Sequence, residues 1–342
     1  MKSVAVVILN WNGLKYLQQF LPSVVEHSSE MAEVWVVDNA STDESLLWIR
    51  ERYPTVRILQ NEQNFGFAKG YNVGLSQIDA EYYVLLNSDV EVTPHWIKPV
   101  IDFMSASSIS ACQPKILDYN RKEWFEHAGA AGGLIDKNGF PFCVGRIFNE
   151  FEKDHGQYND NREVFWASGA ALFIRAEHYH SVEGLDEDFF AHMEEIDLCW
   201  RLKNLGHKVG VCGTSTVYHV GGGTLNAINP YKTYLNFRNN LYLLVKNYHL
   251  SSLAIKLFCR LLLDGVAALR FLLEGKPSYT LAVLKAHISF YLSFTLMLKK
   301  RRKRKFAVSQ SNHTGFYNRS ILADFFLKKR KRFTELDSEA FL

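Results

Sequence analysis

The chain has few of the features that are typical of secreted or disulfide-stabilised proteins. Its 342 residues include five cysteines, an odd number with no Cys-x-x-Cys pair, so we interpret them as reduced packing residues rather than a disulfide framework. The first apolar run, residues 4–9, stops at Asn10 and is too short for the core of a secretory signal. We therefore expect the fold to begin at residue 1 and the protein to lie in the cytoplasm.

The sequence also has no internal repeat and no low-complexity segment. Its hydrophobic share of 47% and charged share of 22% are ordinary for a globular protein, which excludes collagen-like and wholly disordered chains. The length accommodates one large α/β domain with appendages, or two domains of ordinary size. Composition therefore predicts a substantial buried core.

Three apolar, β-branched runs in the first 90 residues each end in a polar cluster. The runs 4–9, 34–37 and 83–86 have the length and composition of buried parallel strands. In an open parallel sheet, ligands bind beyond the carboxyl ends of the strands, so three such clusters converge on one crevice. Each cluster alone could also form a turn or a helix cap. The clusters are Asn10-Trp11-Asn12-Gly13, Asp38-Asn39-Ala40-Ser41-Thr42-Asp43 and Asn87-Ser88-Asp89.

Acidic and imidazole side chains add candidate chemistry at three places. Asp89 could offer a carboxylate to a divalent cation, or simply cap the next helix. Glu194, Glu195 and Asp197 are three carboxylates within four residues, an arrangement that needs solvent, a cation or a proton-transfer task. The alternative is an acidic helix start favoured by the helix dipole. His219 precedes three glycines, which indicates close backbone approach to a ligand, although a lone histidine is more often a hydrogen-bonded structural residue.

The ordered motifs of residues 2–248 resemble those of the family-two glycosyltransferases, especially the bacterial rhamnosyltransferase-like branch. Besides the three strand-end clusters, the shared motifs are Asn64-Phe65-Gly66-Phe67-Ala68-Lys69-Gly70-Tyr71-Asn72, Ser168-Gly169-Ala170, Glu194-Glu195-Ile196-Asp197-Leu198 and His219-Val220-Gly221-Gly222. The resemblance implies a GT-A (Rossmann-like) α/β fold, inverting transfer from a nucleoside-diphosphate sugar, and a divalent metal, Mg²⁺ or Mn²⁺. Two positions depart from the usual pattern, because Asn87 and Glu195 stand where the family more often has Asp.

The resemblance also assigns roles to residues. The implied nucleotide-binding residues are Asn10, Asp38, Asn39, Asn64, Gly66, Asn72, Asn87 and Ser88. The implied metal ligands are Asp89 and His219, and the implied catalytic residues are Glu195 as base with Glu194 or Asp197 assisting the acceptor or shaping the helix. The implied wall near the sugar and acceptor is Trp166, Ser168, Gly169 and Ala170. The implied division is a catalytic domain of 1–248, with a nucleotide-binding half, 1–110, and a sugar and acceptor half, 111–248.

The last third of the chain predicts helices followed by a basic tail. Residues 249–298 have amphipathic and apolar helical patterns, and residues 278–298 are almost long enough to cross a bilayer. The tail, 299–342, holds 13 Lys and Arg against four Asp and Glu, a net charge of +9, whereas the preceding residues carry a net charge of −6. A basic cluster beside an apolar helix suits an anionic membrane surface on its cytoplasmic side. The alternatives are a helical pair packed on the catalytic domain with a solvated tail, or a nucleic-acid arm, which no aromatic-interleaved basic motif supports.

The sequence therefore predicts a cytoplasmic glycosyltransferase, peripheral on the inner face of the cell membrane, with a basic, helical, membrane-associating extension. Its expected donor is dTDP-rhamnose or a UDP-sugar, and its expected acceptor is a saccharide, polyprenyl-linked, for cell-surface polysaccharide synthesis. No nucleic-acid partner is expected. A nucleotidyltransferase ranks lower, because the loop from Asn10 to Gly13 is not a Gly-rich, basic triphosphate loop. The alternative from another class is a catalytically silent sugar-nucleotide-binding or assembly protein at the membrane.

Overall fold

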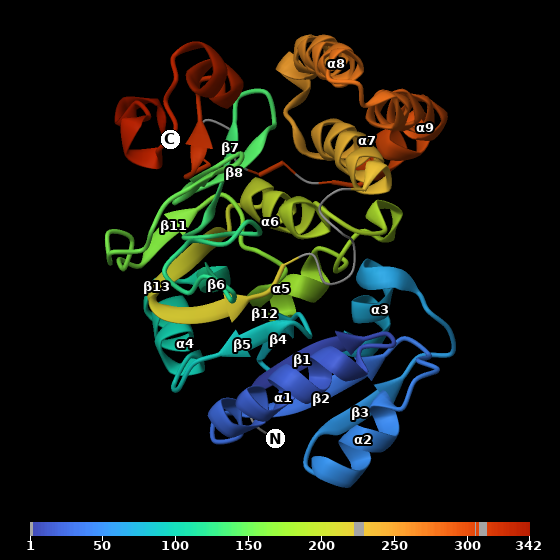
Figure 1. Cartoon of the computed structure of the whole chain (residues 1–342), viewed down its shortest axis with the longest axis vertical. Helices are drawn as coiled ribbons and strands as arrows, with labels where there is room; N and C mark the ends of the chain where they lie inside the picture. Colours follow the sequence, from blue (N-terminus) through green and yellow to red (C-terminus); the bar gives the residue numbers. More distant parts are fainter. Residues whose placement is uncertain (1–2, 222–228, 305, 308–312) are drawn as a thin grey trace.

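The computed structural model describes residues 3–221, 229–304, 306–307 and 313–342, and it is built around one large sheet (Figure 1). Within these residues the sheet has nine strands in the order β11-β13-β6-β12-β4-β1-β2-β3, and β5 pairs with β13. The strands are β1 Val4–Asn10, β2 Ala32–Asp38, β3 Arg57–Gln60, β4 Tyr82–Leu86, β5 Val90–Val92, β6 Ile109–Asp118, β11 Arg162–Val164, β12 Ala171–Arg175 and β13 Lys208–His219. The three strands predicted in the first 90 residues are confirmed as β1, β2 and β4.

Helices cover both faces of this sheet. Along β1, Val4, Val6 and Ile8 pack into a core shared with α1 and α4, whereas Ala5 and Val7 pack into the core shared with α3, α6 and α7. Successive strand residues point to opposite faces, so a strand buried on both sides needs a continuous apolar run. The helices are α1 Leu14–Ser28, α2 Ser45–Arg52, α3 Gly66–Leu75, α4 Ile97–Ala106, α5 Ala176–Ser181, α6 Glu194–Asn204 and α7 Pro230–Asn247.

The register of the parallel strands brings the polar strand ends together. Asn10 pairs with Asp38 across β1 and β2, and Ile8 pairs with Leu86 across β1 and β4. The residues that follow β4 therefore begin beside the ends of β1 and β2. This is the carboxyl edge at which open α/β sheets bind ligands.

Antiparallel pairing brings the later motifs to the same edge. β12 lies antiparallel between β4 and β6, and β13 lies parallel to β6. The end of β13 also pairs antiparallel with β5, so that His219 lies opposite Val90. Two motifs that are about 130 residues apart in the sequence thus become neighbours.

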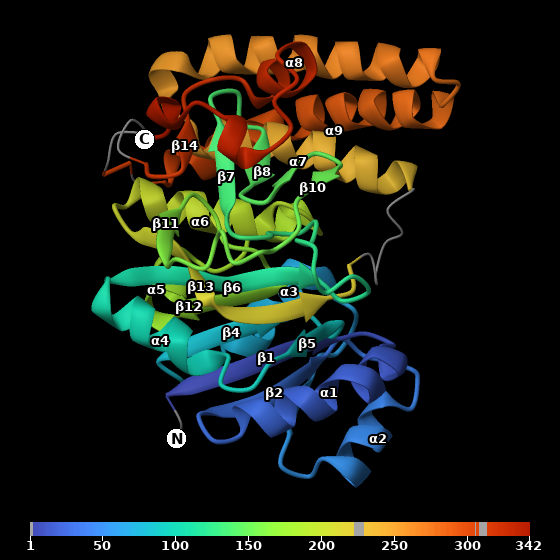
Figure 2. The same cartoon turned by 60° about the vertical axis from the view of Figure 1, so that its left-hand side comes forward.

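A second, smaller sheet incorporates part of the carboxyl-terminal tail (Figure 2). Its order is β10-β9-β8-β7-β14, where β14 comes from the tail and pairs parallel with β7. The backbone N–H of Ile321 donates to Asp136 of β7 at 3.0 Å. The described part of 299–342 is therefore packed on residues within 111–248, in contrast to the separate basic tail expected from the sequence. The strands are β7 Gly133–Asp136, β8 Pro141–Cys143, β9 Arg146–Ile147, β10 Glu150–Phe151 and β14 Phe316–Tyr317.

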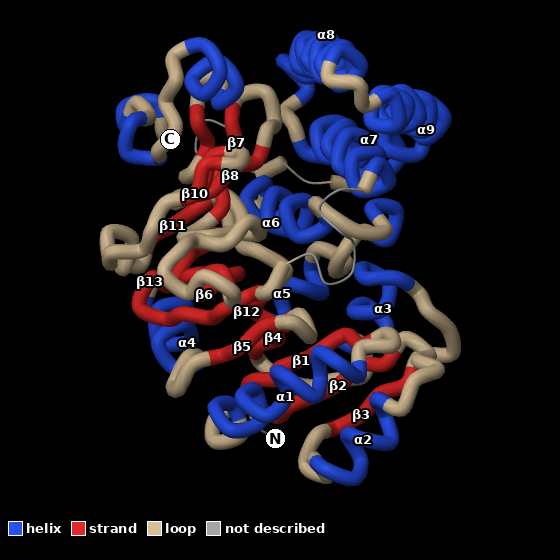
Figure 3. Tube along the Cα trace, viewed as in Figure 1, coloured by secondary structure: helices blue, strands red, loops and turns tan. Residues whose placement is uncertain are grey.

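Two long helices, α8 Leu250–Leu273 and α9 Pro277–Arg302, pack with α7 into a layer at one end of the molecule (Figure 3). Among the described residues, α9 alone is long and apolar enough to cross a membrane by length and composition, and 28% of its most apolar window is buried. The helix continues past the expected boundary at 298. Its Arg301 is buried and donates to the carbonyls of Val245 and Tyr248, at 2.9 and 2.6 Å.

The polar and apolar faces of α8 are reversed relative to an ordinary surface helix. Arg260 and Asp264 are only 4% and 1% exposed, whereas Ile255 and Phe258 are 67% and 63% exposed. The buried pair is bonded at 2.7 Å, and His287 of α9 lies 3.2 Å from Asp264. Of the 21 large hydrophobic side chains exposed in the described residues, 14 lie between Leu250 and Leu296. So many exposed apolar side chains on two adjacent helices indicate a site of interaction.

Candidate functional site

A hydrogen-bonded network closes the ends of β1 and β2. The Nδ2 of Asn10 lies 2.9 Å from Asp38 Oδ1 and 3.0 Å from the hydroxyls of Ser41 and Ser45. Ser41 donates its backbone N–H and its hydroxyl to Asp38, at 2.9 and 2.5 Å. Asp38 is fully buried, so in this structure its carboxylate shapes the loop after β2. Trp11, at the end of β1, is 53% exposed and is a feature of this edge that sequence reasoning did not single out.

Asparagines join this network to the start of α3. Asn39 donates to the carbonyl of Gly66 at 2.9 Å and accepts from Asn61 at 2.8 Å. The backbone N–H of Gly66 donates to Asn64 Oδ1, also at 2.9 Å. Gly66 has a φ of +75°, which favours glycine. The structure thus brings Asn10, Asp38, Asn39, Asn64 and Gly66 to one edge, as the resemblance implies for a nucleotide site.

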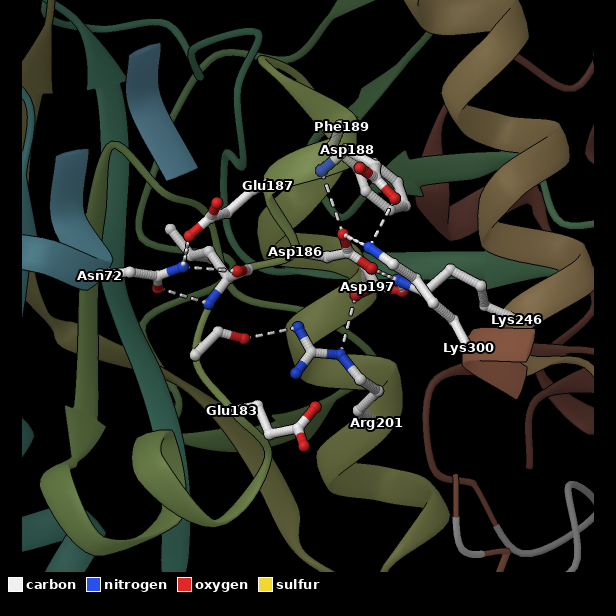
Figure 4. Close-up of polar contacts among 12 residues, drawn as sticks. Asn72, Glu183, Asp186, Glu187, Asp188, Phe189, Asp197, Arg201, Lys246 and Lys300 are labelled. Atoms are coloured by element: carbon white, nitrogen blue, oxygen red, sulfur yellow. Dashed lines mark hydrogen bonds and ion pairs between the residues drawn. The ribbon is translucent and has the colours of Figure 1, made fainter. Parts of the chain in front are cut away.

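Asn72 does not join that group. Its Nδ2 donates to the carbonyl of Leu185 at 2.8 Å, and its Oδ1 accepts from Tyr179 and from the N–H of Leu185, at 2.6 and 3.0 Å (Figure 4). Its amide is therefore committed to holding α3 against the segment before η1 (Glu187–Phe189). These contacts favour a structural role for Asn72 over the predicted role in nucleotide binding.

The Asn87-Ser88-Asp89 turn meets the end of β13 directly. His219 Nε2 lies 3.2 Å from Asp89 Oδ1 and 3.5 Å from Asn87 Nδ2. Its other nitrogen, Nδ1, lies 3.4 Å from Glu126 Oε2. Burial would lower the pKa of His219, but the two carboxylates outweigh it and raise that pKa to about 10. Glu126 is a candidate that the sequence motifs did not contain.

The Asp89 and His219 pair fits one side of a divalent-cation site. Within the described residues, no three His, Cys, Asp or Glu side chains meet in a metal-binding arrangement. A carboxylate behind the second nitrogen of a histidine, as Glu126 lies behind His219, is the arrangement that orients a metal-bound imidazole. The residues present therefore fit a divalent cation.

Glu194 and Glu195 begin α6 and carry perturbed carboxyl groups. Burial, reinforced by the neighbouring Glu195, raises the pKa of Glu194 well above its usual value. Burial also raises the pKa of Glu195, to about 7, although backbone N–H groups oppose that rise. The Oε2 atom of each is buried and has no hydrogen-bond partner within the described residues. A carboxylate with a pKa near neutrality is suited to general base catalysis at physiological pH.

Asp197 belongs to a different environment, a buried cluster of charges (Figure 4). Its carboxylate contacts Lys246 at 2.6 Å, Arg201 at 2.8 Å and Asn247 at 2.7 Å. Burial opposes its ionisation, but Lys246 and Arg201 prevail and lower the pKa of Asp197. Of the two roles that the sequence left open for Asp197, these contacts support shaping the helix rather than assisting the acceptor.

The same cluster reaches the loop before Glu194 and the end of α9. Lys246 also lies 2.5 Å from Asp186, and Lys300 of α9 lies 2.5 Å from both Asp186 and Asp188. Lys300 belongs to the basic run that the sequence predicted for a membrane surface. Here it is occupied by internal ion pairs.

Residues of α7 hold the loop that leads into the two glutamates. Asn239 is fully buried, and its Nδ2 lies 2.8–3.0 Å from the carbonyls of Phe189, Ala191 and His192. In the same loop Phe190, His192 and Met193 have positive φ angles of 65°, 68° and 72°. Such angles are strained for residues with a Cβ and persist only where surrounding contacts enforce them. Asn239 supplies those contacts and was not among the sequence candidates.

The residues predicted to form the wall near the sugar and acceptor occupy different environments in the structure. Gly169 faces Glu195, since a Cβ added there would lie 3.7 Å from the Cβ of Glu195. Ser168 accepts from Ala170 N at 3.2 Å, and both are buried. Trp166 is also buried, with its indole N–H bonded to the carbonyl of Leu134 at 2.9 Å. Trp166 therefore supports the wall from within the core rather than forming its surface.

Two observations limit the extent of this site. Of the glycines after His219, Gly222 and Gly223 lie outside the described residues, as does Thr224. A cavity of about 370 Å³ opens at the far end of β4, beside Tyr83 and His180, and contains none of the candidate residues.

Comparison with known families gives a match over half of the chain. The model described as glycosyl transferase family 2 matches residues 5–178. The Low-salt glycan biosynthesis hexosyltransferase Agl10 of Haloferax volcanii is 24% identical over 285 residues, which cover 81% of this chain and 87% of the relative. The N-acetylglucosaminyl-diphospho-decaprenol L-rhamnosyltransferase of Mycobacterium tuberculosis is 27% identical over 230 residues, which cover 62% of this chain and 72% of the relative.

Solved structures share the fold. Residues 1–349 of S. aureus TarS in complex with UDP-GlcNAc superpose with a TM-score of 0.54 at 15% identity, over 90% of this chain and 93% of that one. GalNAc-T7 with UDP, GalNAc and Mn²⁺ superposes with a TM-score of 0.54 at 16% identity, over 72% of this chain and 48% of that one. These similarities establish the fold as that of the GT-A glycosyltransferases, as the resemblance implied.

Proposed function

Because the chain belongs to glycosyl transferase family 2, we propose that it transfers a hexose from a nucleoside-diphosphate sugar to a saccharide carried on a polyprenyl diphosphate. The observation that carries this proposal is that two elements adjoin: Asn87 donates its backbone N–H to the carbonyl of Ala170 at 3.0 Å, and the preceding Gly169 faces Glu195. A cation held by Asp89 and His219 would neutralise the leaving diphosphate. Glu195, whose pKa is about 7, would act as the base toward the acceptor hydroxyl. Both are needed for displacement of a diphosphate by a hydroxyl.

The reaction is a single displacement with inversion. Glu195 takes the proton of the acceptor hydroxyl, and the oxygen attacks the anomeric carbon from the face opposite the diphosphate. Burial and the neighbouring Glu195 raise the pKa of Glu194 well above its usual value, and we assign this carboxyl group to assist the same acceptor. The strained loop held by Asn239 fixes both carboxyl groups at the start of α6.

Asp89 and His219 would hold the divalent cation, Mg²⁺ or Mn²⁺, with Glu126 orienting His219. Such a cation neutralises the charge that develops on the leaving diphosphate. Asn87 contributes an amide rather than a second carboxylate, so the site carries less negative charge than an Asp-x-Asp element. The presence of Mn²⁺ beside UDP in GalNAc-T7 supports a cation at this edge of the fold.

The donor is dTDP-rhamnose or a UDP-sugar. The former is supported by the similarity to an L-rhamnosyltransferase and the latter by the UDP-GlcNAc bound to TarS, which shares the fold. The edge formed by Asn10, Asp38, Asn39 and Asn64 would receive the nucleoside. Trp11, exposed beside it, offers a ring face to the base.

The apolar face of α8 and α9 supports a lipid-linked acceptor and a peripheral position on a membrane. Its side chains point away from the protein while Arg260 and Asp264 point inward, which is the arrangement favoured by contact with acyl chains. Lys299, Arg302 and Lys303 remain exposed at the end of α9 and would contact anionic headgroups. We place the membrane contact on this face, with the catalytic edge on the cytoplasmic side.

A donor panel tests the function. The protein is incubated with dTDP-rhamnose and a set of UDP-sugars, with and without Mn²⁺ or Mg²⁺, and with a short-chain lipid diphosphate bearing GlcNAc. We expect one donor to give metal-dependent thermal stabilisation and transfer. Asp89→Ala should lose the metal-dependent part, and Glu195→Gln should abolish transfer while nucleotide binding changes by only a few-fold.

Two results would contradict the proposal. Binding of a donor without turnover under every condition would favour the silent binding protein instead. Normal transfer by Glu195→Gln would move the base role to Glu194.

A further inference from the structure

Four nitrogen-bearing side chains gather beside the two glutamates although they come from distant parts of the chain. We call His127, Arg146, His192 and Lys232 the basic group. They lie in the β6–β7 connection, on β9, in the loop before α6 and in the first turn of α7. The ring of His127 lies 6.5 Å from that of Phe151, which pairs with Arg146 across β9 and β10. The carbonyl of His192 accepts from Asn239, which follows Lys232 by seven residues on α7. Electrostatic interactions of His127 with the other three residues agree with this placement. No local motif links the four, so only the fold reveals them.

The basic group adjoins the proposed catalytic base. His192 precedes Glu194 by two residues. Cys143, which is paired with Arg146 in the β8–β9 hairpin, is reached by the charges of both Arg146 and Glu195. A substrate hydroxyl at Glu195 would therefore place its neighbouring groups within reach of these nitrogens.

The two cations of the basic group, Arg146 and Lys232, have no direct ion-pair partner among the described residues. The charge of Glu126 acts on Lys232 and His127, but its carboxylate contacts His219 and the backbone N–H of Ala128 instead of either cation. Two cations kept side by side repel each other unless an anion joins them.

Unused hydrogen-bonding atoms point to the same conclusion. The Nε of Arg146 and the Nε2 of His192 are buried and have no partner within the described residues. Burial, together with the charge of Lys232, lowers the pKa of His192 to about 4. The His192 imidazole is therefore neutral at physiological pH and can donate one hydrogen bond without adding to the repulsion.

We propose that the basic group binds the diphosphate of the lipid-linked acceptor and so places the terminal sugar hydroxyl at Glu195. A guanidinium, an ammonium and two imidazole N–H donors match the several oxygens and the charge of a diphosphate. Lys232 lies on α7, which packs with the α8 and α9 layer that bears the apolar face. The lipid and its diphosphate would thus be held by adjoining parts of the protein.

This inference rests on the proposed function. Kinetics with two acceptors distinguish binding of the acceptor's diphosphate from binding of the donor's diphosphate. The variants Arg146→Gln and Lys232→Gln are assayed with GlcNAc on a short lipid diphosphate, and with the same sugar as an uncharged lipid glycoside. The control is Lys208→Gln, an exposed lysine at the other end of β13 from His219, roughly 35 Å away at strand spacing.

We expect each variant to raise the KM for the diphosphate acceptor by about tenfold or more, as for loss of a charge-assisted hydrogen bond. The KM for the donor and for the uncharged glycoside should stay within about twofold of wild type, and Lys208→Gln should match wild type throughout. A rise in the donor KM alone would assign the basic group to the leaving diphosphate and overturn the proposal. An equal loss with both acceptors would show a general structural defect and also overturn it.

Binding of inorganic pyrophosphate, measured by calorimetry in the presence of EDTA, separates this inference from the proposed function. Wild type and Asp89→Ala should bind pyrophosphate, and Arg146→Gln/Lys232→Gln should not, whether or not any sugar is transferred. If transfer fails but this pattern holds, the anion site stands and the enzymatic proposal falls. If the double variant binds as tightly as wild type, the basic group is not the site.

Discussion

Replacing Lys246 by Met should destabilise the protein more than any surface charge substitution. Its side chain is fully buried, and Nζ lies 2.5 Å from Asp186 and 2.6 Å from Asp197. Met preserves most of the volume but leaves both carboxylates without their shared cation. Lys300 and Arg201 remain in contact with one carboxylate each, so the cluster is weakened rather than emptied.

The expected magnitude follows from that geometry. Breaking a buried ion pair by removing one partner costs about 3–5 kcal/mol. At about 2 °C per kcal/mol for a large domain, the midpoint of thermal unfolding should fall by roughly 6–10 °C. The matched control is Lys276→Met, which breaks an exposed pair with Glu274 at 2.9 Å and should leave the midpoint of thermal unfolding nearly unchanged.

The pH dependence of unfolding gives a second readout. Burial opposes ionisation, but the lysines prevail and hold the pKa values of Asp186 and Asp197 below the usual 3.8. A depressed pKa contributes stability above the unfolded value that is lost as the pH falls through the folded value. Wild type should therefore lose stability below about pH 4, and Lys246→Met should lose less. A Lys246→Met protein within about 1 kcal/mol of wild type, with an unchanged acid profile, would refute the reasoning.

Four further outcomes are expected. Asn239→Ala removes the donor to three loop carbonyls and should lower kcat at least tenfold with little change in donor KM, measured by steady-state kinetics; a parallel change in both would contradict a positioning role. Because the raised pKa of Glu195 is about 7, kcat should rise as the pH increases through about 7 and then level off, and a flat profile from pH 5.5 to 8.5 would exclude Glu195 as the base. Glu126→Gln should weaken Mn²⁺ affinity in the nucleotide complex by about 10–100-fold, as for other groups that orient a metal-bound histidine; unchanged metal titration would remove that role. Ile255→Ser/Phe258→Ser should reduce flotation with anionic vesicles, whereas Leu47→Ser, equally exposed on α2 at 55%, should not; equal flotation of all three proteins would remove the membrane contact from α8.

The strand ends and the long helices could be predicted from the sequence because their signals are local. An apolar β-branched run followed by a polar turn describes β1, β2 and β4 almost completely, and the fold then brings their ends together by register alone. The pattern of residues 251–273 likewise predicted α8. What it did not reveal is which face of α8 is buried, since periodicity does not say whether Arg260 or Phe258 faces inward.

Partnerships between distant residues could not be predicted in this way. Asp197 and Glu195 look alike in the sequence. Yet Asp197 is neutralised by Lys246, 49 residues away, whereas Glu195 has no cation bonded to it in the part of the chain that the structure describes. Glu126 reaches His219 only because β6 and β13 pair in parallel. The basic run near 300 reads as a solvated patch, but Lys300 and Arg301 find internal partners. The identity of a residue tells which chemistry its side chain has, but not which distant side chain it contacts in the fold.

The order in which the small sheet is assembled has a consequence for folding in the cell. The backbone of Ile321 bonds to Asp136 across a sequence separation of 185 residues, and β14 pairs with the edge of β7 beside it. At about 5–20 residues per second, translation needs roughly 10–40 s to supply that partner. Throughout this interval β7 presents an open edge that could pair with another nascent chain. A chaperone that shields this edge should therefore raise the yield of soluble protein. Slow synthesis of the segment that contains β14 should lower that yield.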